Sequence, residues 1–137
     1  ALYGMQAIVP HFVERGEGHL INVSSHLSRV PVASYRAAYS GAKAMLNVLT
    51  ENLRMDLRDD HPNVHVSLVL PGLVSTDFAK HALGGPPSGV LVSATPAQAV
   101  ADAAREIVAL ISEPRAELYT NPALAEMVKR RFAAPLT

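Results

Sequence analysis

Apolar side chains recur along this chain with two different periods, and the two periods predict helices and strands in turn. Spacings of three and four residues predict a helix over 1–15 and a longer helix over 34–60, which ends before the His61-Pro62 step. The apolar face expected for the longer helix consists of Ala42, Met45, Leu46, Leu49, Leu53 and Leu57.

Short runs rich in β-branched residues indicate strands at 19–25 and 64–70, and a further strand is expected at 116–120. Between the second and third strands, residues 77–95 have little periodicity and contain Gly84-Gly85-Pro86-Pro87, which predicts a loop. Two more helices follow from the pattern. One is expected to be capped by Thr95 with Pro96 at its first position, and the other to cover 122–132.

A strand, a long helix and a second strand in succession form a βαβ unit, which requires the two strands to be parallel. The expected fold class is therefore α/β, with a doubly wound parallel sheet of about three strands and flanking helices. In such sheets, ligands bind at the carboxyl ends of the strands. Ser24 and Ser25 end the first strand, and Pro71, Gly72 and Thr76 follow the second, so all of these residues are expected at that edge.

Tyr39 and Lys43 are the most informative pair, because a phenol and an ammonium four residues apart share one face of a helix. A nearby positive charge favours the phenolate over the phenol, which suits a general acid/base. On an ordinary amphipathic helix the same pattern is usually structural, so its surroundings decide its meaning. Tyr35 lies four residues earlier and is interpreted as a pocket or core aromatic.

Three motifs in order make the chain resemble the short-chain dehydrogenase/reductase family. They are the Asn22-Val23-Ser24-Ser25 strand end, the Tyr39-x-x-x-Lys43 helix and the Pro71-Gly72-Leu73-Val74-Ser75-Thr76 turn. The resemblance implies a Rossmann-like fold and an enzyme that interconverts an alcohol and a carbonyl with NAD or NADP. It also covers nearly the whole chain, since Gln6-Ala7 and Pro10 are similar to the helix that precedes the serine strand in that family.

The resemblance implies a role for each matching residue. Ser25 would hold the substrate oxygen, Tyr39 would give or take its proton, and Lys43 would assist Tyr39 and bind the nicotinamide ribose. Tyr39 and the turn formed by Pro71, Gly72 and Thr76 would also contribute to the cofactor site. Ser24 or Ser28 remains an alternative to Ser25 as the hydroxyl that contacts the substrate.

The family's glycine-rich pyrophosphate turn and its catalytic Asn have no counterpart in residues 1–137. We therefore expect these residues to be the C-terminal catalytic half of one Rossmann-like domain, without the N-terminal dinucleotide-binding half. The choice between NAD and NADP depends on that other half and stays open. An alternative hypothesis follows: the chain is a non-catalytic fragment or interaction module that cannot bind the cofactor alone.

Composition narrows the remaining function classes. Twelve basic and twelve acidic residues balance, which argues against a nucleic-acid partner. Cysteine is absent, so thiolate chemistry is excluded and a cytoplasmic protein is expected. The six histidines are scattered without the spacing of a helical zinc motif, and no apolar run reaches the length of a membrane span.

Partners are expected to be a small alcohol or carbonyl substrate and further copies of the chain. The helices at 1–15 and 34–60 resemble the pair that forms the family's two-fold interface, which implies a homodimer or homotetramer. Apolar residues in and beside the 77–95 loop indicate a hydrophobic or bulky carbonyl compound, namely Leu73, Phe78, Leu83 and Val90.

Overall fold

The computed structural model of this chain describes residues 1–30, 36–78 and 96–134. The expectations for Tyr35, for the Thr95 cap and for most of the 77–95 loop lie outside these residues. In chain order the elements are α1 (Leu2–Arg15), β1 (Gly18–Val23), the short 3-10 helix η1 (His26–Ser28), α2 (Ala37–Leu57), β2 (Val64–Val69), α3 (Val100–Ser112), β3 (Glu117–Leu118) and α4 (Pro122–Ala133).

The described strands form one parallel sheet with the order β1-β2-β3. β1 and β2 pair along their whole length, from Gly18 opposite Val64 to Val23 opposite Val69. β3 is much shorter and pairs only with the last two residues of β2. The predicted α/β class with a parallel sheet of about three strands is confirmed.

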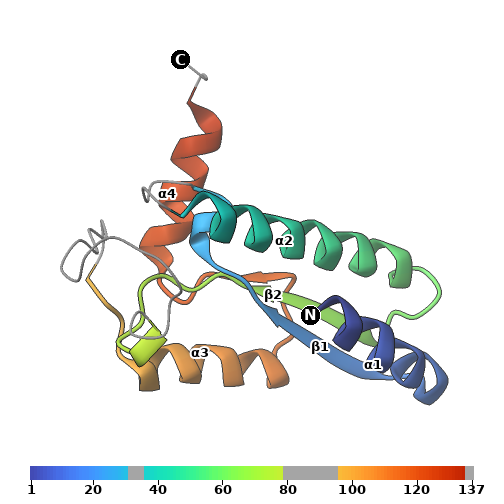
Figure 1. The fold of residues 1–137 in the computed structure, drawn as a ribbon. Helices are drawn as coiled ribbons and strands as arrows, with labels where there is room; N and C mark the ends of the chain where they lie inside the picture. Colours follow the sequence, from blue (N-terminus) through green and yellow to red (C-terminus); the bar gives the residue numbers. More distant parts are fainter. Residues whose placement is uncertain (31–35, 79–95, 135–137) are drawn as a thin grey trace.

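Helices cover both faces of this sheet, α1 and α2 on one side and α3 on the other (Figure 1). Alternate residues of β2 supply the two cores, because successive side chains of a strand point to opposite faces. Val64 and Val66 pack with Leu57 of α2 and with apolar side chains of α1. Val69 packs on the opposite face with Leu110 of α3 and Leu118 of β3. No helix in the described ranges combines the length and apolar character needed to cross a bilayer.

The predicted start of the third long helix was wrong by several residues. α3 begins at Val100 rather than at Pro96, and its N-cap is Ala99. Gln98 instead pairs with Val74 in an isolated parallel bridge, and its side-chain amide donates to the carbonyl of Thr120 at 2.9 Å. Backbone and side-chain partners from two distant segments thus hold Gln98 outside the helix.

The predicted apolar face of α2 was also partly wrong. Met45 is 62% exposed, whereas Asn47 and Thr50 are buried on the face that covers the sheet. Buried polar side chains are tolerated when they are hydrogen-bonded, and both of these residues have partners in or after β1. The helix is therefore rotated relative to the position that its apolar residues alone would favour.

Candidate active site

The turns that follow β1 and β2 meet at the carboxyl edge of the sheet. The backbone N–H of Ser24 donates to the carbonyl of Val69 at 2.8 Å, which extends the ladder beyond the two strands. His26 then donates its backbone N–H to the carbonyl of Pro71 at 3.0 Å, and its ring Nδ1 lies 3.2 Å from the same oxygen. The serine turn and the proline turn are thus joined directly.

Ser25 caps η1 at the end of this ladder and is 6% exposed. Its hydroxyl oxygen accepts a hydrogen bond from the backbone N–H of Leu27 at 3.2 Å. The hydroxyls of Ser24 and Ser28 both donate to other groups, to Asn47 and to the carbonyl of Ser25 respectively. Among the described residues, Ser25 is the one of these three whose hydroxyl proton has no acceptor.

Tyr39 and Lys43 lie one turn apart near the start of α2, and both are half-buried. The Nζ atom of Lys43 donates to the carbonyl of Val23 at 2.8 Å and lies 6.0 Å from the centre of the Tyr39 ring. Burial lowers the pKa of Lys43 below its usual value. The ring of Tyr39 meets that of Phe78 edge-on, with centroids 6.0 Å apart.

The turn after β2 brings its own expected residues to the same edge. Pro71 supplies the carbonyl that binds His26. Gly72 packs closely on α4, because a β-carbon there would lie 2.8 Å from Cδ1 of Leu124 and the Leu124 side chain would have to shift. Thr76 is exposed, and its hydroxyl oxygen accepts from the backbone N–H of Phe78 at 3.3 Å. Thr76 therefore holds the residue that contacts the Tyr39 ring.

These contacts place each expected site residue in one of three neighbouring segments. Within the described parts of the chain, no hydrogen bond joins Ser25 to Tyr39. The serine segment and α2 are connected through a neighbour, because the hydroxyl of Ser24 donates to Oδ1 of Asn47 at 2.6 Å.

Residues 1–84 match the family model described as short chain dehydrogenase, which is more than half of the chain. The chain belongs to the short-chain dehydrogenase family. Its curated relatives include dehydrogenase/reductase SDR family member 7B of Danio rerio, 32% identical over 117 residues, which are 82% of this chain and 37% of that protein. The uncharacterized oxidoreductase YxnA of Bacillus subtilis is 33% identical over 122 residues, which are 86% of this chain and 33% of that one. The chain thus spans about a third of the length of these relatives.

Solved structures of short-chain dehydrogenases agree with the fold. One from Burkholderia cenocepacia in complex with NADP has a TM-score of 0.72 and 29% identity, and the match covers 95% of this chain and 50% of that one. Another from Burkholderia phymatum in complex with NAD has a TM-score of 0.79 and covers 99% of this chain and 58% of that one. Its identity is only 21%, so that likeness shows the fold alone.

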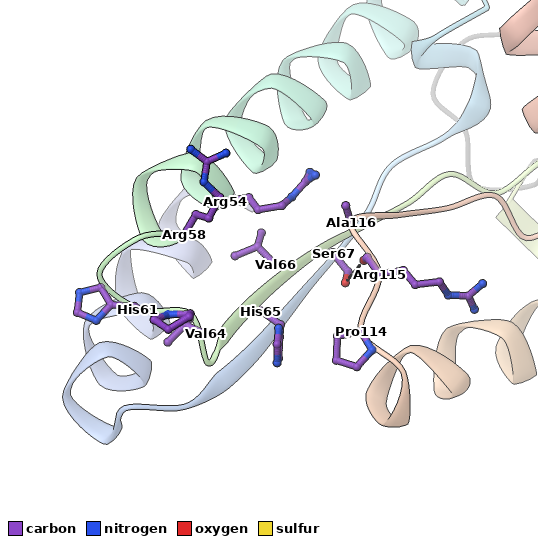
Figure 2. Close-up of a pocket in the computed structure, with 11 residues that line it drawn as sticks. Arg54, Arg58, His61, Val64, His65, Val66, Ser67, Pro114, Arg115 and Ala116 are labelled. Atoms are coloured by element: carbon purple, nitrogen blue, oxygen red, sulfur yellow. Dashed lines mark hydrogen bonds between the residues drawn. The ribbon is translucent and has the colours of Figure 1, made fainter.

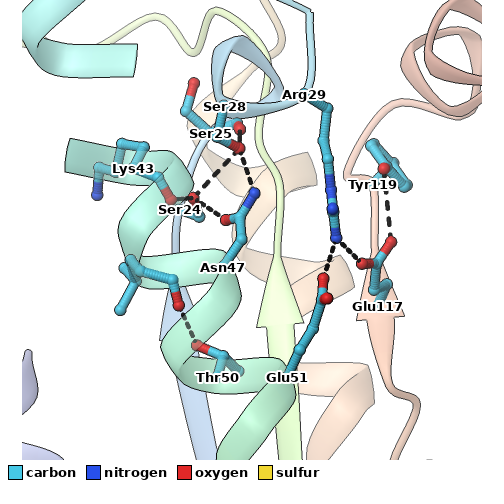
Figure 3. A network of polar contacts seen from close by, with 11 residues as sticks. Ser24, Ser25, Ser28, Arg29, Lys43, Asn47, Thr50, Glu51, Glu117 and Tyr119 are labelled. Atoms are coloured by element: carbon cyan, nitrogen blue, oxygen red, sulfur yellow. Dashed lines mark hydrogen bonds and ion pairs between the residues drawn. The ribbon is translucent and has the colours of Figure 1, made fainter. Parts of the chain in front are cut away.

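Sequence reasoning missed a buried polar network beside the serine turn of this short-chain dehydrogenase (Figure 3). Asn47 of α2 bonds the hydroxyls of Ser24 and Ser28, at 2.6 and 2.7 Å. One turn further along α2, Thr50 accepts from the side-chain amide of Asn22 at 2.9 Å. The sequence did contain a sign of this network. Asn47 and Thr50 follow Lys43 by four and seven residues, a spacing that places all three on one face of the helix.

A second missed group lies on the other side of the serine turn. The guanidinium of Arg29, which caps the end of η1, forms ion pairs with Glu51 of α2 and Glu117 of β3 (Figure 3). Burial disfavours the charged guanidinium, but the two carboxylates outweigh this effect and raise the pKa of Arg29. Burial and the neighbouring Glu117 carboxylate raise the pKa of Tyr119 in the same cluster. Arg29 therefore links the segment after Ser25 to both a helix and a strand.

A hollow lined by 11 residues lies at the opposite edge of the sheet, away from Ser25, Tyr39 and Lys43 (Figure 2). It is present because β3 pairs only with the end of β2, which leaves the first part of β2 open on that side. The residues that line it include Arg54, Arg58, His65, Ser67 and Arg115. In Figure 2 the Arg115 side chain extends away from the other arginines. This hollow does not contain the residues expected to react.

The hydrogen bonds of His19, on the strand beside this hollow, require a proton on its Nε2 atom. The hydroxyl of Ser67 donates to the carbonyl of Arg115, so it must accept from Nε2 of His19, which lies 2.8 Å away. Nδ1 of His19 is buried without a partner. Burial, and secondarily the neighbouring His65, lowers the pKa of His19, which agrees with a neutral ring in a structural role.

Histidine and carboxylate side chains do not gather into a metal centre in the part of the chain that the structure describes. His26 bonds to Pro71, and burial lowers the pKa of His26 despite that bond. The ring of His26 therefore favours the neutral state and joins two turns of the site.

Proposed function

We propose that this short-chain dehydrogenase interconverts an alcohol and a carbonyl, with hydride transfer to or from NAD or NADP. The observation that carries the proposal is the arrangement at the carboxyl edge of the sheet. There the serine turn donates a backbone hydrogen bond to Pro71 in the turn after β2. Lys43, near the start of α2, donates to the carbonyl of Val23, just before the serine turn. Parallel α/β sheets bind their ligands at this edge, and the solved relative from Burkholderia cenocepacia was crystallised with NADP.

Ser25 is the proposed holder of the substrate oxygen. Its hydroxyl proton has no acceptor among the described residues, and its oxygen is already oriented by the backbone N–H of Leu27. A donor oriented before the substrate arrives stabilises developing negative charge without reorganisation. Ser24 and Ser28 are less suited to this role, because their hydroxyls already donate within the protein.

Tyr39 is the proposed general acid/base. It gives its phenolic proton to the substrate oxygen when a carbonyl is reduced and takes that proton back when an alcohol is oxidised. The nicotinamide supplies the hydride-transfer chemistry when bound. The apolar ring of Phe78, which lies against Tyr39, supports a hydrophobic substrate on this side of the site.

Lys43 is the proposed link between Tyr39 and the cofactor. Its ammonium has three protons to donate and bonds the carbonyl of Val23, so donors remain for ribose hydroxyls. The exposed hydroxyl of Thr76 and the backbone of Pro71 and Gly72 would bind the carboxamide group of the nicotinamide ring. This set of an ammonium, a hydroxyl and backbone groups fits the polar atoms of a nicotinamide riboside.

The Lys43→Met variant tests this assignment. We expect the dissociation constant for NADH or NADPH to rise by about tenfold or more, because a hydrogen bond to a charged donor contributes about 1.5–3 kcal/mol. Fluorescence titration of the reduced cofactor measures the change. Lys129→Met is the matched control, because Lys129 is an exposed lysine on α4 that bonds only Glu126 at 2.7 Å. Equal affinities in wild type and Lys43→Met would contradict the role of Lys43.

Self-association through α1 and α2 is also proposed, as a homodimer or homotetramer. The outer surface of these helices carries exposed large apolar side chains, namely Tyr3, Met45, Val48 and Met55. The last three recur on α2 at spacings of three and seven residues, so they lie along one helix face. Sedimentation equilibrium of the natural protein should show a dimer or tetramer at micromolar concentration, and a monomer there would contradict this proposal.

A further inference from the structure

A directed chain of hydrogen bonds runs through the side chain of Asn47 and ends on Ser25 (Figure 3). Ser24 donates its hydroxyl proton to Oδ1 of Asn47 at 2.6 Å. Nδ2 of Asn47 donates to the hydroxyl oxygen of Ser28 at 2.7 Å, and Ser28 donates its own proton to the carbonyl of Ser25. Ser28 has one proton and gives it to this carbonyl, so its oxygen must accept from Asn47, and Oδ1 of Asn47 then faces Ser24. The carbonyl of Lys43 lies farther from the Ser24 hydroxyl, at 3.1 Å.

The orientation of the Asn47 amide is fixed by these partners. If the amide were reversed, the hydroxyl of Ser28 would face Oδ1 and would have to donate to it. Ser28 would then lose the only proton with which it binds the carbonyl of Ser25. Because Asn47 is 2% exposed, water cannot replace the missing bond easily.

Asn47 lies four residues after Lys43, which itself lies four residues after Tyr39, so the three residues follow one another along the same side of α2. The amide of Asn47 bonds the residue before Ser25 and, through Ser28, the carbonyl of Ser25 itself. The helix that carries Tyr39 is thereby connected to both sides of the Ser25 backbone. No other described side chain of α2 bonds both Ser24 and Ser28.

We propose that Asn47 is a positioning residue that sets the place of the Ser25 hydroxyl relative to Tyr39. This inference rests on the function proposed above for Ser25 and Tyr39. Asn47 does not touch the reacting atoms and acts through the serine turn. A displacement of about 1 Å between reacting groups can cost about a hundredfold in rate. A hydrogen bond that fixes the distance between Ser25 and Tyr39 should therefore affect kcat more strongly than it affects the affinity for the cofactor.

The test compares Asn47→Leu with Thr50→Val in the full-length natural protein. Both variants replace a buried polar side chain of α2 by an apolar one of similar shape, and Thr50 is 0% exposed. Thr50 bonds Asn22 and the carbonyl of Leu46 but not the serine turn. We expect Asn47→Leu to lower kcat by at least about tenfold, with the KM for NAD(P)H within about twofold of wild type. Thr50→Val should lower the unfolding midpoint in urea but leave kcat within about twofold.

A double-mutant cycle with Ser28→Ala distinguishes a positioning effect on Ser25 from a nonspecific loss of stability. Ser28→Ala removes the bond to the Ser25 carbonyl while Asn47 stays in place, so it should lower kcat in the same direction. When Ser28→Ala is added to Asn47→Leu, little further loss is expected, because the two residues act through one chain of bonds. Fully additive losses would overturn the proposal, as would equal losses of kcat in Asn47→Leu and Thr50→Val.

Amide hydrogen exchange supplies a readout that does not depend on turnover. The N–H of Leu27 donates to the hydroxyl oxygen of Ser25, so its exchange should be faster in Asn47→Leu and unchanged in Thr50→Val. Unchanged Leu27 exchange in Asn47→Leu would overturn the role of Asn47 even if the enzyme is active. If wild-type protein oxidises no alcohol and reduces no carbonyl with NAD(P), the proposed function fails, whereas the exchange result still decides whether Asn47 holds Ser25.

Discussion

Replacing Tyr39 with phenylalanine is expected to lower kcat by at least about a hundredfold, because positioned proton transfer contributes about 10²–10⁴ to rate. The variant removes one oxygen atom and keeps the ring. The edge-on contact with Phe78 should therefore persist, and the fold should be unaffected. The measurement is steady-state turnover of an alcohol or carbonyl with NAD(P) by the full-length natural protein.

Tyr119→Phe is the matched control for this variant. Tyr119 is also half-buried, but its hydroxyl lies 3.5 Å from Glu117 in the Arg29 cluster and takes no part in the proposed proton transfer. Its removal should leave kcat within about twofold of wild type. A Tyr39→Phe enzyme with near wild-type turnover would refute the proton-transfer role, and an equal loss in both variants would show that the effect is not specific to Tyr39.

The expected loss depends on Tyr39 acting together with Ser25 and Lys43, and the structure shows how separate segments could act as one unit. Lys43 bonds the last residue of β1, while His26 bonds the turn after β2. The first of these bonds ties the helix of Tyr39 and Lys43 to β1, and the second ties the turn of Ser25 to the segment after β2. A reaction that needs a hydride donor, a proton donor and a bound oxygen at fixed distances favours such cross-links.

The sheet and its helices could be predicted from local periodicity, because the parallel βαβ unit leaves a repeating apolar pattern in the sequence. The same pattern could not place Asn47 or Thr50. A buried polar residue has no hydrophobic signal, and its burial is tolerated only because Ser24 and Asn22 supply hydrogen bonds from 23 and 28 residues away. The exposed position of Met45 follows from the same polar contacts, since they determine which side of α2 faces the sheet.

Contacts between distant segments explain the other differences. Gln98 was expected inside the helix that begins at Pro96, but its bridge with Val74 and its bond to Thr120 hold it outside that helix. Arg29 pairs with Glu117, 88 residues later in the chain, and no local pattern indicates that pair. The assignment of 1–137 to the C-terminal half of a larger domain stays a prediction, as do the roles of Ser25, Tyr39 and Lys43.

Replacing Leu110 with alanine is expected to lower the free energy of unfolding by about 2–5 kcal/mol, the usual cost of emptying a fully buried leucine site. Leu110 of α3 is 0% exposed and packs with Val69 and Leu118 beneath the sheet. Ile111→Ala is the matched control, because Ile111 is the next residue of the same helix and is 66% exposed. That change should alter stability by no more than about 0.5 kcal/mol. Urea unfolding followed by circular dichroism measures both variants, and equal losses would contradict the placement of α3 against this face.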